Sequence, residues 1–83
     1  MNNQIKYIAK IPTEFQSDAV QWLTIEPHLN NGNIVGYFLF GHKALTEPSE
    51  WDIWFQNLGG AFEAGLDYGI ERKDWIEKES DQI

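Results

Sequence analysis

The sequence predicts an α+β fold, in which an antiparallel sheet of three to four strands carries one C-terminal helix on one face. Three observations lead to this prediction: short segments with alternating apolar residues, an Asn-Gly pair between two such segments, and a later segment with apolar residues at helical spacing. The chain has 83 residues, which is the size of one domain, and we expect that domain to span residues 1–76.

Two N-terminal strands are expected where apolar residues alternate and a proline follows. In residues 5–11 the odd-numbered positions form an apolar face, and Pro12 ends the segment because it has no N–H for the ladder. Residues 19–26 form the second segment, with Trp22 on one face, and we expect Pro27 to end it in the same way.

The third and fourth strands follow a turn. Asn31 and Gly32 lie between apolar segments, and this pair is a strong local signal for a hairpin because both residues tolerate positive φ. Residues 34–40 are apolar at almost every position, so this strand is expected inside the sheet with both faces at least partly covered. After a polar loop at 41–50, residues 51–55 alternate again and predict the fourth strand.

A helix is expected after Asn57, whose side chain is placed to cap the first turn. Gly69 is expected to end the helix as a left-handed C-cap, and Trp75 to return to the core. Each glycine inside the helix costs about 1 kcal/mol of helix propensity relative to alanine. We therefore expect these glycines to let the helix backbone approach the sheet closely, so that packing offsets this cost. Residues 77–83 are mostly polar and are expected to form a frayed acidic tail. The apolar stripe of the helix consists of Leu58, Ala61, Phe62, Gly65 and Leu66.

The second half of the chain carries a pattern of strand, helix and closing residues. Its parts are a Gly-aromatic-Leu-Phe strand at 36–40, a Trp-Phe strand end at 54–55, an alanine-spaced helix, a Gly-Ile pair at 69–70 and an Asp-Trp pair at 74–75. In these residues the chain resembles a group of small uncharacterised bacterial α+β proteins. The resemblance supports the fold and implies no activity, cofactor or catalytic residue.

Composition and charge exclude several classes of protein. Without cysteine the chain has no disulfide, no thiolate zinc site and no cysteine nucleophile. No apolar run approaches the roughly 18 residues that a membrane helix needs, and residues 1–4 lack the order of a signal peptide, so a cytoplasmic protein that does not bind membranes is expected. The net charge of −7 argues against nucleic acid as a partner, because Lys and Arg must neutralise its phosphates.

No motif in the sequence indicates catalysis, and we expect a non-enzymatic protein with no metal or cofactor. His28 and His42 are the candidate bases, yet neither belongs to a nucleophile motif. Glu26 and His28 have the i, i+2 spacing of one strand face, but Pro27 separates them and nothing matches a zinc or calcium loop. A small enzyme with a site near His28 or His42 remains an alternative.

An aromatic face of the sheet is the strongest candidate for a functional site. If the helix covers the face with Trp51, Ile53 and Phe55, strand parity places a second apolar face on the other side. Such a patch is rare on a soluble monomer, and Trp and Tyr are enriched in binding hot spots. Alternatively, the loops or the tail cover this face. The residues expected to bind a partner there are Trp22, Tyr37, Leu39, Asp52 and Trp54, with Val20, Thr24, Val35 and Ile8 beside them.

Two hypotheses about binding follow, and they differ in the partner. In the first, the chain is a small acidic interaction protein that docks a protein partner, preferably a basic one, through the aromatic face. Inhibitors and immunity proteins of toxins and nucleases have this size and charge, which makes them the class analogy for this hypothesis. In the second, the same face joins two copies of the chain into a homodimer with a structural or regulatory role.

Overall fold

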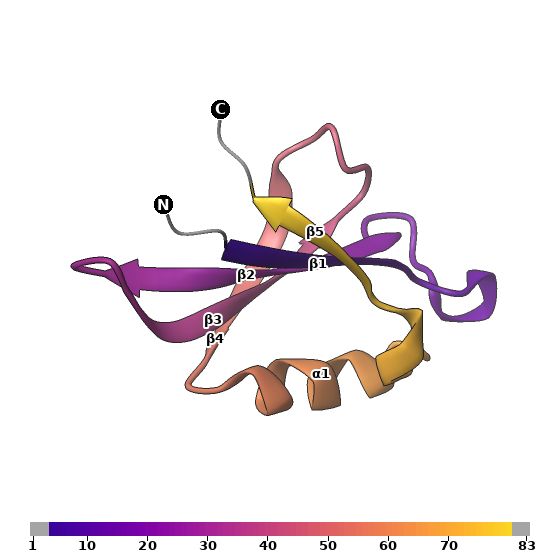
Figure 1. The fold of residues 1–83 in the computed structure, drawn as a ribbon. Coiled ribbons are helices and arrows are strands. Elements are labelled where there is room, and N and C mark those ends of the chain that lie inside the picture. Colours follow the sequence, from indigo (N-terminus) through magenta and orange to yellow (C-terminus); the bar gives the residue numbers. More distant parts are fainter. Residues whose placement is uncertain (1–3, 81–83) are drawn as a thin grey trace.

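Five antiparallel strands and one α-helix make up the fold in the computed structural model, which describes residues 4–80 (Figure 1). The strands lie in the order β4-β3-β2-β1-β5, and α1 lies against one face of the sheet. The predicted class is confirmed, but the sheet has five strands rather than three to four. The elements are β1 (Gln4–Lys10), β2 (Trp22–Asn30), β3 (Asn33–His42), β4 (Ser49–Phe55), α1 (Leu58–Leu66) and β5 (Ile76–Ser80), with short 3-10 helices at Thr13–Phe15 and Arg72–Asp74.

The hairpin between β2 and β3 forms as the sequence predicts. β2 ends at Asn30, β3 begins at Asn33, and the residues between them, Asn31 and Gly32, have φ values of 54° and 82°. Positive φ at both central positions is typical of the type I′ turn, whose twist matches that of the paired strands. β3 lies between β2 and β4, which agrees with its apolar sequence on both faces.

β2 is longer than predicted because Pro27 does not end it. Pro27 lies opposite Tyr37 of β3, well inside that pairing. On its other side, β2 pairs with β1 only over the segment from Trp22 to Ile25. Pro27 lies beyond this ladder, where a residue without an N–H is tolerated. The expectation that the proline terminates the strand is therefore wrong.

The C-terminal residues join the sheet, which corrects the expectation of a frayed tail from residue 77. β5 pairs antiparallel with β1, in a register that places Glu77 opposite Tyr7. Three of its five residues are charged, as is common for edge strands, because charge hinders pairing with a further chain. The domain thus extends past residue 76, and residues 81–83 of the expected tail lie outside the described residues.

Caps at both ends define the helix, as predicted. The Oδ1 atom of Asn57 accepts a hydrogen bond of 2.9 Å from the backbone N–H of Gly60. Gly69 has a φ of 78°, and the N–H of Ile70 donates to the carbonyl of Gly65 at 3.0 Å, which is the long-range bond of a Schellman motif. Ile70 is itself buried, so the residue that follows the capping glycine packs into the hydrophobic core.

Loss of the N-terminal cap is expected to destabilise the whole domain. Asn57→Ala should lower the free energy of unfolding by about 1 kcal/mol, because the N–H of Gly60 loses its acceptor. Urea denaturation followed by circular dichroism measures this change. The exposed neighbour Gln56 is the control, and Gln56→Ala should change the free energy by less than about 0.5 kcal/mol. Equal losses in the two variants would contradict the capping role.

The hydrophobic core fills the space between the sheet and α1. Leu23 and Ile25 of β2 and Leu39 of β3 are fully buried, and Trp75 closes the core as predicted, with 5% of its surface exposed. Within the described residues, no helix packs on the opposite face of the sheet (Figure 1). The other core residues are Tyr7, Ala9, Ile11, Val20, Ala61 and Ile70.

Candidate functional site

The register of the strands assigns each side chain to one of two faces. Residues directly opposite one another in antiparallel neighbours point to the same face. The set that contains Ile25, Leu39 and Ile53 faces α1, and the alternate set forms what we call the open face. The open face consists of Lys6, Ile8 and Lys10 of β1, Trp22, Thr24, Glu26 and His28 of β2, Phe38, Phe40 and His42 of β3, Asp52 and Trp54 of β4, and Ile76 and Lys78 of β5.

Three of the five predicted binding residues lie on the open face, namely Trp22, Asp52 and Trp54. The other two, Tyr37 and Leu39, lie on the covered face, and Leu39 is fully buried there. Val20, which was expected beside Trp22, precedes β2 and belongs to the core. The predicted face is therefore correct for β2 and β4 and wrong for β3.

A β-bulge explains the exchange of faces in β3. The two-residue turn, continued evenly along the hairpin, would place Thr24 opposite Leu39. The register instead shifts by one residue just before the turn, and Thr24 lies opposite Phe40. Because side chains alternate along a strand, one extra residue moves the whole set to the other face. In the same way, Phe38 takes the open-face position expected for Tyr37.

Aromatic rings form a continuous row along β3 on the open face. The His28 ring lies 5.1 Å from Phe38, and Phe38 lies 5.8 Å from Phe40, measured between ring centres. His42 ends the row at 6.1 Å from Phe40. These distances are in the range in which aromatic pairs attract one another. The row was not predicted, because its two phenylalanines were assigned to the helix side.

Trp54 of the edge strand is held against this row. Its Nε1 donates a hydrogen bond of 3.0 Å to Nδ1 of His28, and the two rings meet edge to face at 6.4 Å. Gly36 makes room for the indole, because a Cβ at this position would overlap it. Trp54 nevertheless keeps 46% of its surface exposed. The indole is thus oriented by its neighbours and accessible to a partner.

His42 joins the row to the loop between β3 and β4. Its Nε2 lies 2.9 Å from the Thr24 hydroxyl, and its Nδ1 lies 3.2 Å from the carbonyl oxygen of Glu47. Since a carbonyl only accepts, Nδ1 carries the proton and the hydroxyl donates to Nε2. The loop rises from the sheet on the side away from α1 (Figure 1). It borders the open face and leaves Trp54 exposed.

Lysines and carboxylates both lie on the open face. Nζ of Lys6 pairs with Glu26 at 3.4 Å, and Nζ of Lys10 lies 5.7 Å from the centre of the Trp22 ring. Charges of both signs therefore lie beside the rings of this face. Its lysines are Lys6, Lys10 and Lys78, and its carboxylates are Glu26 and Asp52.

The negative charge is concentrated around β4 and α1 instead. Residues 44–71, which we call the acidic segment, hold six acidic side chains and no Lys or Arg, against a net charge of −7 for the chain. In the part of the chain that the structure describes, Glu71 is the one member that makes an ion pair, with Lys73. The six acids are Glu47, Glu50, Asp52, Glu63, Asp67 and Glu71.

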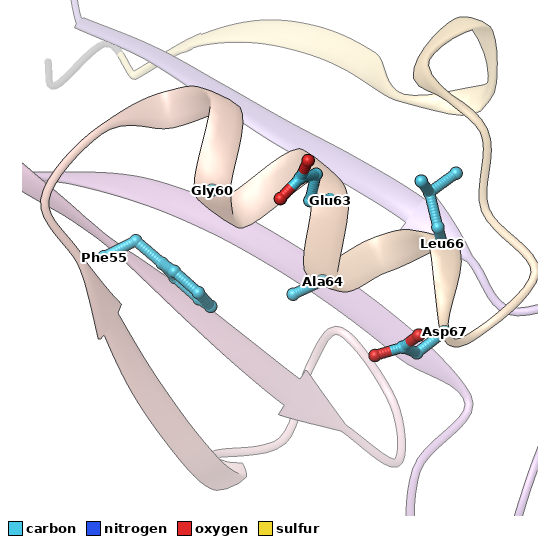
Figure 2. Close-up of a pocket in the computed structure, with 6 residues that line it drawn as sticks. All are labelled: Phe55, Gly60, Glu63, Ala64, Leu66 and Asp67. Carbon is cyan, nitrogen blue, oxygen red and sulfur yellow. The ribbon is translucent and has the colours of Figure 1, made fainter.

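A shallow hollow of about 440 Å³ lies in the acidic segment, between the end of β4 and α1 (Figure 2). Phe55 and Leu66 supply its apolar walls, together with Gly60 and Ala64 of the helix. Leu66, which was expected in the packed stripe, is 56% exposed beside it. The carboxylates lining the hollow are those of Glu63 and Asp67. No feature of the sequence alone predicted this hollow.

The two histidines do not meet in one site. His28 and His42 lie at opposite ends of the aromatic row, and both rings already have hydrogen-bond partners. Across residues 4–80, no three His, Asp or Glu side chains are placed to hold a metal ion. Over the same residues, no helix has the length and apolar character needed to cross a membrane.

Comparison with known proteins identifies no family for this chain. No protein-family model matches it, and no curated protein or solved structure matches it either. The resemblance to small bacterial α+β proteins stays a prediction. Function is therefore inferred from the side chains of the open face and of the acidic segment.

Proposed function

We propose that the chain is a small non-enzymatic protein that binds a protein partner through its open face. Contiguous apolar surface on a monomer is typical of interaction sites, and tryptophan is enriched at the centres of interfaces. The observation that carries the proposal is a row of aromatic rings with an exposed tryptophan beside it: His28, Phe38, Phe40, His42 and Trp54.

The fixed position of Trp54 favours this role. Its hydrogen bond to His28 and its seat over Gly36 orient the indole before a partner arrives. Ordering a free side chain at an interface costs about 0.5–1.5 kcal/mol, and a side chain that is already oriented avoids most of that cost. The open face is thus organised for binding without a large rearrangement.

The charges around the rings indicate the chemistry of the partner. Lysines and carboxylates both flank the row, so a partner surface with an apolar centre and a rim of mixed charge fits this face. This revises the preference for a basic partner that the net charge suggests. A role as an inhibitor or immunity protein stays a prediction from size and charge.

The test compares two neighbours on β4. Trp54 and Ile53 have similar exposed fractions, 46% and 48%, but they lie on opposite faces of the sheet. The immobilised chain is used to capture partners from a lysate of its source organism, and the affinity of each captured partner is then measured with purified components. Trp54→Ala should weaken binding by about tenfold or more, whereas Ile53→Ala should leave it within about twofold.

Sedimentation velocity of the purified chain distinguishes a partner from a second copy. We expect a monomer. A dimer that Trp54→Ala dissociates would favour the homodimer alternative over the proposal. Binding to a partner that is lost equally in both variants, or in neither, would contradict a role for the open face.

A further inference from the structure

The outer edge of β4 is free to pair with another strand. β4 is the first strand in the order β4-β3-β2-β1-β5, so its outer side has no neighbouring strand within residues 4–80. Its backbone N–H and C=O groups on that side are available for a further ladder. The seven-residue strand also exposes large apolar side chains on both faces, Ile53 at 48% and Trp54 at 46%. Such an edge is a template for strand addition.

We propose that β4 accepts an extended segment of a partner protein, rich in lysine or arginine, as an added strand. The ladder forms at the outer edge of β4, which the proposed function does not use, so the proposal goes beyond that function although the added strand also meets Asp52 and Trp54 of the open face. β5, the other edge, is less suited to this role, because three of its five residues are charged and both signs are present. β4 contains only acidic charges, Glu50 and Asp52.

Charge selects the occupant of the edge. The acidic segment, which includes β4 and α1, holds six carboxylates and no Lys or Arg, and five of these carboxylates have no ion pair among the described residues. Pairing two copies through β4 would bring two such sets together, and like charges across an interface are unfavourable. A basic segment instead supplies the missing counter-charges.

The hollow beside β4 fits the side chains of such a segment. Side chains of an added strand alternate between the two faces, so every second one points to the helix side. A lysine there can lay its methylene groups against Phe55 and Leu66 and place its ammonium at Glu63 or Asp67 (Figure 2). Residues that point to the other face meet Asp52 and Trp54, and an indole also attracts cations.

The test titrates the isotope-labelled chain with a synthetic peptide as long as β4, seven residues, made of alternating lysine and valine with blocked ends. Two-dimensional NMR should show its largest shifts at the backbone amides of β4 and α1, and not at those of β5. A peptide with glutamate in place of lysine should bind at least about tenfold more weakly, because its charge is reversed. A lysine-valine peptide that is N-methylated on alternate residues should weaken similarly, since it cannot complete the ladder.

A matched pair of double variants tests the role of the hollow. Glu63→Gln with Asp67→Asn should weaken binding of the lysine-valine peptide by about fivefold. Glu77→Gln with Glu79→Gln removes the same amount of charge from β5 and should change binding by less than about twofold. Urea denaturation confirms that each variant is folded before the titration.

Several outcomes would overturn the proposal. Equal binding of the N-methylated peptide would show charge attraction without strand addition, and equal binding of the glutamate peptide would show that charge does not select the occupant. NMR shifts centred on β5 would show that the peptide binds the opposite edge of the sheet and not β4. A dimer of the free chain with protected β4 amides would show that a second copy occupies this edge. The titration uses purified chain and peptide, so its result does not depend on a partner of the open face.

Discussion

Leu39→Ala is expected to lower the free energy of unfolding by about 3 kcal/mol. Leu39 is 0% exposed and lies on β3 between Ile25 and Ile53 of the neighbouring strands. Truncation removes its buried methyl groups and leaves a cavity that hydrogen-bonded strands on both sides cannot close. A domain of 83 residues has a total stability of roughly 4–12 kcal/mol, so this single change removes a large part of it.

Ile53→Ala is the matched control for this prediction. Ile53 lies directly opposite Leu39 and on the same face, but it is 48% exposed. Its loss should cost less than about 1 kcal/mol, as measured by urea denaturation of both variants. Equal losses at the two positions would contradict the burial of Leu39. A larger loss from Phe40→Ala than from Leu39→Ala would indicate that the faces of β3 are exchanged.

The elements that the sequence predicts correctly depend on interactions within a few residues. The turn at Asn31 and Gly32 requires positive φ, and the residues that adopt it easily are present at the turn itself. The caps at Asn57 and Gly69 form hydrogen bonds with backbone groups of the same helix whose ends they mark. None of these signals depends on which strand lies next to which, so the sequence is sufficient to identify them.

The elements that the sequence predicts wrongly depend on neighbours distant in the chain. Residues 77–80 resemble a polar tail, and they form a strand because β1 offers them a free edge. Pro27 remains inside β2 because the ladder with β1 has already ended beside it. Local propensity carries no information about either neighbour. Both differences therefore come from tertiary context.

The candidate site was predictable where strand alternation is clear. β4 alternates, so Asp52 and Trp54 were assigned correctly to the face away from α1. β3 is apolar at almost every position, so its own sequence does not determine which residues face the helix. The bulge decides this, and it places Phe38 and not Tyr37 on the open face. The net charge likewise did not locate the site, because it does not tell on which face of the sheet the lysines and the carboxylates come to lie.

Gly65→Leu is expected to lower the free energy of unfolding by about 3 kcal/mol through overpacking. A Cβ at Gly65 would lie 2.8 Å from Cζ2 of Trp75, closer than real Cβ contacts allow. Trp75 has little room to yield, because it is 5% exposed and its ring lies 5.8 Å from that of Phe62. It also directly precedes β5, so its displacement should strain the pairing of β5 with β1. Urea denaturation gives the loss, and near-ultraviolet circular dichroism should show altered tryptophan packing.

Gly59→Ala in the same helix is expected to have the opposite sign. A Cβ at Gly59 would meet only Oδ1 of Asn57 at 3.6 Å, an ordinary contact, so the smaller conformational freedom of alanine in the unfolded chain should raise the free energy of unfolding by about 0.5–1 kcal/mol. Stabilisation by both variants would mean that Trp75 does not pack against Gly65. Opposite signs would show that the helix glycines do not share one role: Gly65 is required by the indole of Trp75, whereas Gly59 is replaceable because no packed side chain occupies its surroundings.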